Sequence, residues 1–120
     1  MLIARSPLMD TIQNEKVKEH TFLQPMLADS YFPKHLVAKG QDLLRQLAER
    51  IEREAPEGEA VYELTRATTC AFNELQREFC EAGSDIETAA RDAIGSDIEF
   101  ILKAYGYDVD IEKAIGNRDW

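Results

Sequence analysis

Apolar residues recur every three or four positions through the middle of the chain, which is the spacing of one stripe along a helix. The longest stripe, in residues 60–81, contains Val61, Leu64, Thr68, Ala71, Phe72, Leu75 and Phe79. A second stripe follows Pro33, which suits the first turn of a helix, and continues to about Glu54. The turn at residues 55–58 separates the stripes, so the pattern predicts two long antiparallel helices. Gly40 lies on the second stripe at a cost of about 1 kcal/mol relative to alanine, so we expect a close helix contact there.

Shorter helices are predicted on both sides of this pair. Gly83 ends the longest stripe, and Ser84-x-x-Glu87 directly after it is typical of a capping box, in which the two side chains bond each other's backbone amides. Ser96-x-x-Glu99 is a second such box. With glycine stops at positions 95, 106 and 116 and an aspartate cap at position 108 or 110, these signals predict helices over residues 84–95, 96–105 and 108–115. A short helix over residues 11–18 and a helical turn over residues 22–27 come before the long pair.

We therefore expect an all-α fold, a single-domain bundle of two long antiparallel helices and three shorter ones. The chain has no strand-like alternation of useful length and no internal repeat. Its 120 residues are the size of one domain, to which we assign residues 20–120, with residues 1–19 as a polar, flexible leader. No apolar run approaches the ~20 residues of a membrane span, and no secretory signal pattern opens the chain. The expected location is the cytoplasm, away from membranes.

The charge lies almost entirely in the second half of the chain. Residues 1–55 contain eight basic and eight acidic residues, whereas residues 56–120 contain six basic and fifteen acidic ones, which accounts for the whole net charge of −9. Such a field repels nucleic acid and anionic membranes and attracts basic partners. Solubility is an alternative explanation for the same charge, because acidic proteins are common.

Carboxylates on the longest helix are the first candidate for chemistry. Glu74, Glu78 and Glu81 follow one another at spacings of four and three and so share a helix face. Carboxylates placed in this way can hold Mg²⁺ in helical nucleotide hydrolases when further acids converge from a neighbouring helix. Candidates for those further acids are Asp92, Asp97 and Glu99. A solvated face opposite the apolar stripe explains the same residues without a metal.

A second candidate group combines aromatic and acidic residues near the end of the sequence. Tyr105, Tyr107 and Trp120 lie among several acids, including Asp108 and Asp110. Aromatic side chains are common anchors in interfaces, and surrounding acids steer a basic partner. Alternatively, these aromatic side chains close one end of the bundle. The two histidines, at positions 20 and 35, have no partner at metal-ligand or nucleophile spacing, and the common catalytic motifs are absent.

Several strings together resemble an uncharacterised bacterial family of small, acidic, all-helical proteins. The strings are Asp29-Ser30-Tyr31-Phe32-Pro33, Phe72-Asn73-Glu74-Leu75-Gln76, Ala82-Gly83-Ser84-Asp85-Ile86-Glu87-Thr88 and Ala104-Tyr105-Gly106-Tyr107-Asp108. The resemblance covers roughly residues 20–120. It implies an all-helical fold and carries over no activity and no active-site residue.

The leading functional hypothesis is a non-catalytic binding protein that uses neither a cofactor nor a metal. In its most concrete form, the protein is of the immunity or antitoxin type, and its acidic half masks a basic protein partner. The residues expected to bind that partner are Glu74, Glu78, Glu81, Asp108, Asp110 and Trp120. The alternative is a metal-dependent nucleotide hydrolase built on the helix carboxylates, and a third hypothesis is a homo-oligomeric structural protein.

Overall fold

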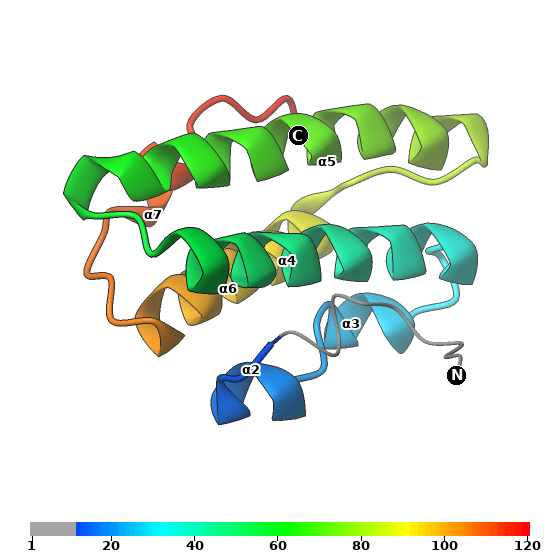
Figure 1. The fold of residues 1–120 in the computed structure, drawn as a ribbon. Helices are drawn as coiled ribbons and strands as arrows, with labels where there is room; N and C mark the ends of the chain where they lie inside the picture. The colour runs from blue at the N-terminus through cyan, green and yellow to red at the C-terminus, as the bar shows by residue number, and fades with distance from the viewer. Residues whose placement is uncertain (1–11) are drawn as a thin grey trace, which may run out of the picture.

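The computed structural model describes residues 12–120, which form an all-α domain without a strand among them (Figure 1). The predicted fold class is therefore confirmed. Residues 1–11, which include most of the expected leader and the first residue of the expected helix over residues 11–18, lie outside the described part. The elements are α2 (Glu15–Glu19), α3 (Gln24–Leu27), α4 (Lys34–Glu54), the 3₁₀ turn η1 (Gly58–Ala60), α5 (Val61–Glu81), α6 (Thr88–Ala104) and α7 (Ile111–Ala114).

The two long helices, α4 and α5, are 21 residues each and lie side by side (Figure 1). Leu44, Leu47 and Phe72 on their facing stripes are at most 1% exposed. Gly40 lies at the closest part of this contact, because a Cβ atom there would stand 3.2 Å from Cε1 of Phe72 and 2.8 Å from Cδ1 of Leu23. The predicted antiparallel pair and the predicted close approach at Gly40 are both confirmed.

α6 is one continuous helix, so the prediction of two helices separated at Gly95 is wrong. Ile94, Ile98 and Ile101 are fully buried and form one uninterrupted stripe across the glycine. Burying side chains of this size contributes about 1.5–3 kcal/mol each, which exceeds the cost of about 1 kcal/mol for a glycine inside a helix. The second predicted capping serine, Ser96, consequently lies in the middle of α6.

The predicted capping box at Ser84 is also wrong. The Ser84 amide donates to the carbonyl of Phe79 at 2.8 Å, and the Gly83 amide donates to Cys80 at 3.1 Å. These two bonds form a Schellman motif, with Gly83 in the left-handed region at φ +83°. Because Ser84 is used to end α5, the chain continues without helix until α6 begins at Thr88, where no side chain caps the helix.

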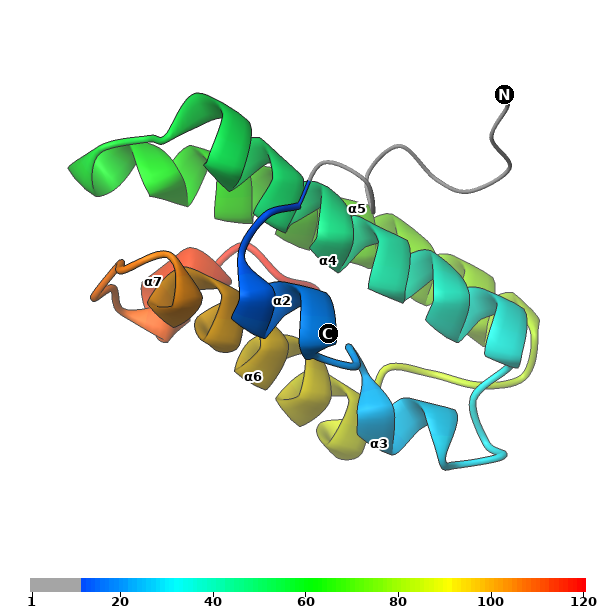
Figure 2. The ribbon, with the colours of Figure 1, turned by 60° about the horizontal axis from the view of Figure 1, so that its bottom comes forward.

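The short helices and α6 form a second layer beside the α4–α5 pair (Figure 2). α2, α3 and α7 each contact α6. Ile12 and Val17 are only 4% and 3% exposed. The described part of the expected leader, residues 12–19, is therefore packed into the domain.

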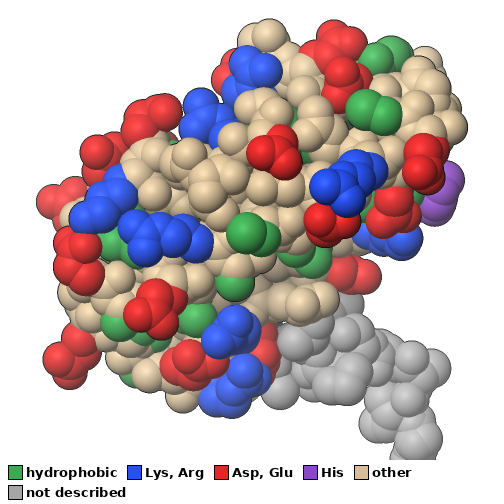
Figure 3. All heavy atoms as spheres, turned by 90° about the horizontal axis from the view of Figure 1, so that it is seen from above, with side chains coloured by type: hydrophobic (Ala, Val, Ile, Leu, Met, Phe, Trp, Pro, Cys, Tyr) green, Lys and Arg blue, Asp and Glu red, His purple; other side chains and the backbone are tan. Residues whose placement is uncertain are grey.

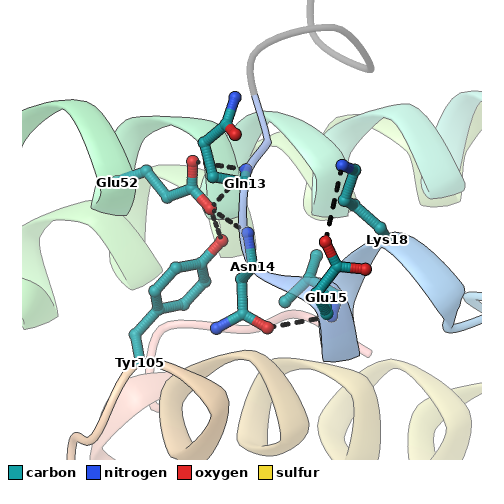
Figure 4. Close-up of polar contacts among 7 residues, drawn as sticks. Gln13, Asn14, Glu15, Lys18, Glu52 and Tyr105 are labelled. Atoms are coloured by element: carbon teal, nitrogen blue, oxygen red, sulfur yellow. Dashed lines mark hydrogen bonds and ion pairs between the residues drawn. The ribbon is translucent and has the colours of Figure 1, made fainter.

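Glu52 on α4 joins the two layers near the start of the described chain (Figure 4). Its carboxylate accepts hydrogen bonds from the backbone amides of Gln13 and Asn14, each at 2.9 Å, and from the hydroxyl of Tyr105 at 2.6 Å. The Asn14 side chain in turn donates to the carbonyl of Ala104 at 2.9 Å. One carboxylate thus fixes the segment before α2 against both α4 and the end of α6.

The Glu52 junction is expected to make stability depend on pH. Burial favours a higher pKa for Glu52, but the hydrogen bonds from Tyr105, Gln13 and Asn14 outweigh it, so the pKa of Glu52 lies below its usual value. The unfolded chain therefore binds a proton more readily, and the stabilisation is present above a pH of about 4.5 and lost as pH falls below it. Urea unfolding between about pH 3 and pH 6 should show a steeper loss of stability for the wild type than for Glu52→Gln. Parallel pH profiles for the two proteins would contradict this assignment.

Candidate functional site

The predicted carboxylates on α5 point to solvent and form pairs of their own. Glu74 lies 3.3 Å from Nη1 of Arg77, and Glu78 lies 2.5 Å from Nζ of Lys39 on α4. Glu81 is exposed at the last position of the helix. These acids share a face, as the spacing predicts, but the pairs leave each carboxylate beside a cation or in water.

The second predicted group is divided between the surface and the core. Asp108 and Asp110 are exposed, and the Asp110 side chain caps α7 by accepting from the amide of Glu112 at 3.0 Å. Trp120 is only 7% exposed and packs edge-to-face on Phe72, with ring centroids 6.2 Å apart. The tryptophan side chain closes the bundle and offers little surface to a partner.

The two tyrosines of that group also bond inward. The Tyr105 hydroxyl donates to Glu52 at 2.6 Å, and the Tyr107 hydroxyl donates to the carbonyl of Pro56. Burial raises the pKa of both hydroxyls, for Tyr105 together with the neighbouring Glu52 carboxylate. These aromatic residues therefore hold the α6–α7 connection against the end of α4 and the turn that follows it.

The predicted acids do not converge on one place. The amide of Asp110 bonds the hydroxyl of Tyr62 at the start of α5, whereas Glu81 ends the same helix. Nineteen residues separate these points on α5, which corresponds to about 28 Å. Within residues 12–120, no three His, Cys, Asp or Glu side chains are grouped so that they could hold a metal ion. The hydrolase alternative therefore rests on the carboxylate spacing alone.

Helix α5 stops and helix α4 starts at the same end of the bundle (Figure 1). The segment before α4 contains an exposed aromatic residue. Tyr31 is 43% exposed and is the large hydrophobic side chain that the described part of the chain leaves in solvent. Its hydroxyl donates to Glu87 at 2.9 Å, and its amide donates to the side chain of Asp29 at 2.9 Å. Its ring packs edge-to-face on the buried Phe32 at 5.1 Å. We call Tyr31 with Asp29, Glu81, Asp85 and Glu87 the acidic end.

The electrostatics of the acidic end are set by these close contacts. The hydrogen bond to Glu87 raises the pKa of the Tyr31 hydroxyl, and burial and the negative charge of Glu87 add to the effect. Asp85 accepts from Gln76 at 3.2 Å and from the amide of Ile86 at 2.7 Å, and these bonds lower the pKa of its carboxyl. The Asp85 carboxylate is therefore charged at neutral pH. The arrangement offers an aromatic ring within a negative field, which favours a cationic ligand.

Sequence reasoning missed Tyr31, which it used only as part of a string that carries the family resemblance. The available signal was an aromatic residue two positions after an aspartate, between two predicted helical segments. That signal does not give exposure, because the adjacent Phe32 is equally apolar and is 3% exposed. Only the packing of the loop decides which of the two rings is buried.

A second arrangement that the sequence did not indicate joins the α2–α3 connection to α6. Nε2 of His20 lies 2.8 Å from Oδ1 of Asp97, and the other oxygen of Asp97 accepts from the amide of Leu23 at 2.6 Å. The His20 ring stacks on Phe100 at 4.0 Å. Leu23 has the left-handed backbone conformation, at φ 56°, which is uncommon for a residue with a Cβ atom. The spacing in the sequence showed no partner for His20, because Asp97 lies 77 positions along the chain.

Charged side chains of both signs spread over the face seen in Figure 3. Acidic residues lie mainly along the edges, with basic residues between them, and no single hollow collects them. The open distribution agrees with the separate ion pairs on α5.

The comparison with protein families shows where this chain belongs. None of the helices in residues 12–120 is long and apolar enough to cross a membrane. No curated protein and no solved structure shows significant similarity to the chain. The model of a family described as "Family of unknown function (DUF5713)" matches residues 16–120. The match starts four residues before the expected limit of the resemblance and includes all of α2 except its first residue, Glu15. The chain therefore belongs to the DUF5713 family, a family of unknown function.

Proposed function

We propose that this protein is a non-catalytic binding protein whose acidic end docks onto a basic protein partner. The observation that carries the proposal is the exposure of Tyr31 among carboxylates. A tyrosine presents a large, amphipathic contact area at a low entropic cost, and tyrosines are enriched among the residues that dominate binding energy. The hydrogen bond to Glu87 and the contact with Phe32 hold the ring in place before the partner arrives.

The charge distribution supports a basic partner. The net charge is −9, and acids at the rim of an interface increase the rate of association with a positively charged surface. Glu81 and Glu87 are exposed and have no basic partner within residues 12–120, so a partner's Lys or Arg side chains can pair with them. In the most specific form of the proposal, the protein is an immunity-type or antitoxin-type inhibitor that covers the basic surface of a toxic enzyme.

The experiment is affinity capture from the cells that express the protein, followed by binding measurements with the purified partner. We expect a basic partner whose dissociation constant rises with salt concentration. Tyr31→Ala should weaken binding by about 30-fold, since removal of a hot-spot residue costs about 2 kcal/mol. Glu81→Lys combined with Glu87→Lys should lower the association rate by about tenfold or more.

A matched control separates the acidic end from the general charge of the protein. Glu57→Lys combined with Glu63→Lys makes the same change of charge at exposed positions near the other end of α5. This control should retain most of the affinity and differ from the wild type only through long-range, salt-sensitive steering. A neutral or acidic partner, or an equal loss of affinity in the control and the acidic-end variant, would refute the proposal.

A further inference from the structure

A polar groove runs between α6 and α7, on a part of the surface that the proposed function does not use. Its volume is about 270 Å³, slightly below the range of roughly 300–1,000 Å³ usual for ligand pockets. Two arginines and three acids line it together with the hydroxyl of Ser96: Arg91, Arg118, Asp92, Glu99 and Glu112. The groove therefore offers both signs of charge within a space that suits a small molecule.

Arg91 differs from the other arginines in the described part of the chain. Five of those others pair with a carboxylate at 4 Å or less, and Arg66 lies over the ring of Tyr62. The Nε atom of Arg91 is buried without a hydrogen-bond partner, and the Arg91 guanidinium forms no ion pair among residues 12–120. A partly buried cation without a counter-ion is unfavourable, and it is unexpected in a protein with excess acids.

Arg118 is only loosely held on the other side of the groove. Its Nη1 donates to the carbonyl of Ile115 at 3.2 Å, and its Nη2 lies 3.6 Å from Glu112. Its Nε atom, like that of Arg91, is buried without a partner. Two guanidinium groups with unused donors thus face one groove, and a carboxylate is the group that guanidinium donors bind best in a bidentate manner.

We propose that this groove binds a small zwitterion of the α-amino acid class. The ligand's carboxylate lies against Arg91 and Arg118, and its ammonium group lies against Asp92. Glu99 lies beside Lys103 at 3.6 Å and adds to the negative charge of the groove. The acids in the groove explain why the ligand must carry both charges, since they repel a simple anion and attract a cation. The volume limits the ligand to about the size of a single amino acid.

Titration of the full chain, followed by NMR or calorimetry, tests the proposal with glycine, L-alanine, acetate, methylammonium and inorganic phosphate as probes. We expect saturable binding of the two amino acids, and at least about tenfold weaker binding of acetate, methylammonium and phosphate. Arg91→Gln should weaken glycine binding by at least about tenfold. The glycine affinity of Arg91→Lys should lie between those of the wild type and Arg91→Gln, because lysine keeps the charge but lacks the planar guanidinium group. Arg77→Gln removes the same charge from exposed α5 and should leave binding unchanged.

Asp92→Asn provides a second variant that does not touch the guanidinium groups. It should weaken glycine binding and leave acetate binding equal or slightly stronger, because only the ammonium group loses its counter-charge. Circular dichroism confirms that each variant is folded. Absence of amino-acid binding, equal binding of acetate and glycine, tighter binding of phosphate, or an Arg77→Gln effect as large as that of Arg91→Gln would each overturn the proposal.

Discussion

Replacing Asp97 with alanine is expected to destabilise the protein by about 3 kcal/mol, because its carboxylate makes one buried and one partly buried hydrogen bond. One holds the amide of Leu23 at 2.6 Å, and the other holds His20 at 2.8 Å. Without Asp97, the Leu23 amide is left buried without an acceptor, since Leu23 is 1% exposed. The left-handed conformation of Leu23, which costs an L-residue about 1–2 kcal/mol, then also loses the bond that supports it.

Urea unfolding followed by circular dichroism measures this effect. Asp92→Ala is the matched control, because it removes the same charge from an exposed position of the same helix, and its effect should stay within about 0.5 kcal/mol. Asp97→Asn retains an acceptor for Leu23 and should lose less stability than Asp97→Ala. If Asp97→Ala and Asp92→Ala unfold at the same urea concentration, the bond to Leu23 does not stabilise the fold.

Gly40→Ala is expected to cost about 2 kcal/mol, although alanine is the better helix former, because the new methyl group has no room. Its Cβ atom would lie 2.8 Å from Cδ1 of Leu23 and 3.2 Å from Cε1 of Phe72. The Leu23 side chain has little freedom to move away, since its backbone is held by Asp97 and its side chain is 1% exposed. The methyl group therefore pushes α4 away from its neighbours or forces strained side-chain rotamers.

Gly95→Ala makes the same chemical change inside α6, and its effect on stability should have the opposite sign. The nearest atom to a Cβ at Gly95 is Cδ1 of Ile115 at 3.7 Å, an ordinary van der Waals distance. Here the better helix propensity of alanine should dominate and raise stability by up to about 1 kcal/mol. Thermal and urea unfolding of both variants check the pair. A stabilised Gly40→Ala protein would show that the contact of α4 with α5 and α3 adapts easily.

Local patterns in the sequence were enough to predict the helices whose apolar stripes and end residues lie within the helix itself or next to it. The stripes of α4 and α5, the turn between them and the stop at Gly83 all arise from interactions within a few residues. The antiparallel pairing of α4 and α5 also followed, because a short turn leaves two long apolar stripes few other ways to become buried. The all-α fold class could therefore be predicted from the chain alone.

The helix boundaries that were predicted wrongly involve residue types that can start, end or continue a helix. Ser84 and Ser96 both occur in capping-box patterns, yet Ser84 completes the end of α5 and Ser96 lies within α6. The same is true of glycine, because Gly83 ends a helix and Gly95 does not. What decides between the roles is the burial of Ile94, Ile98 and Ile101 against other helices, which no local pattern contains.

The sequence by itself determined the helical class, the long pair, the excess of acid and the absence of common catalytic motifs, because composition and short-range periodicity fix these properties. Only the tertiary structure decided that Trp120 is buried, that Tyr31 is exposed, and that Arg91 has no counter-ion within residues 12–120. It also brought His20 and Asp97 together across 77 positions. Exposure and charge pairing depend on which distant segments pack against a residue, so they arise only when the whole chain has folded.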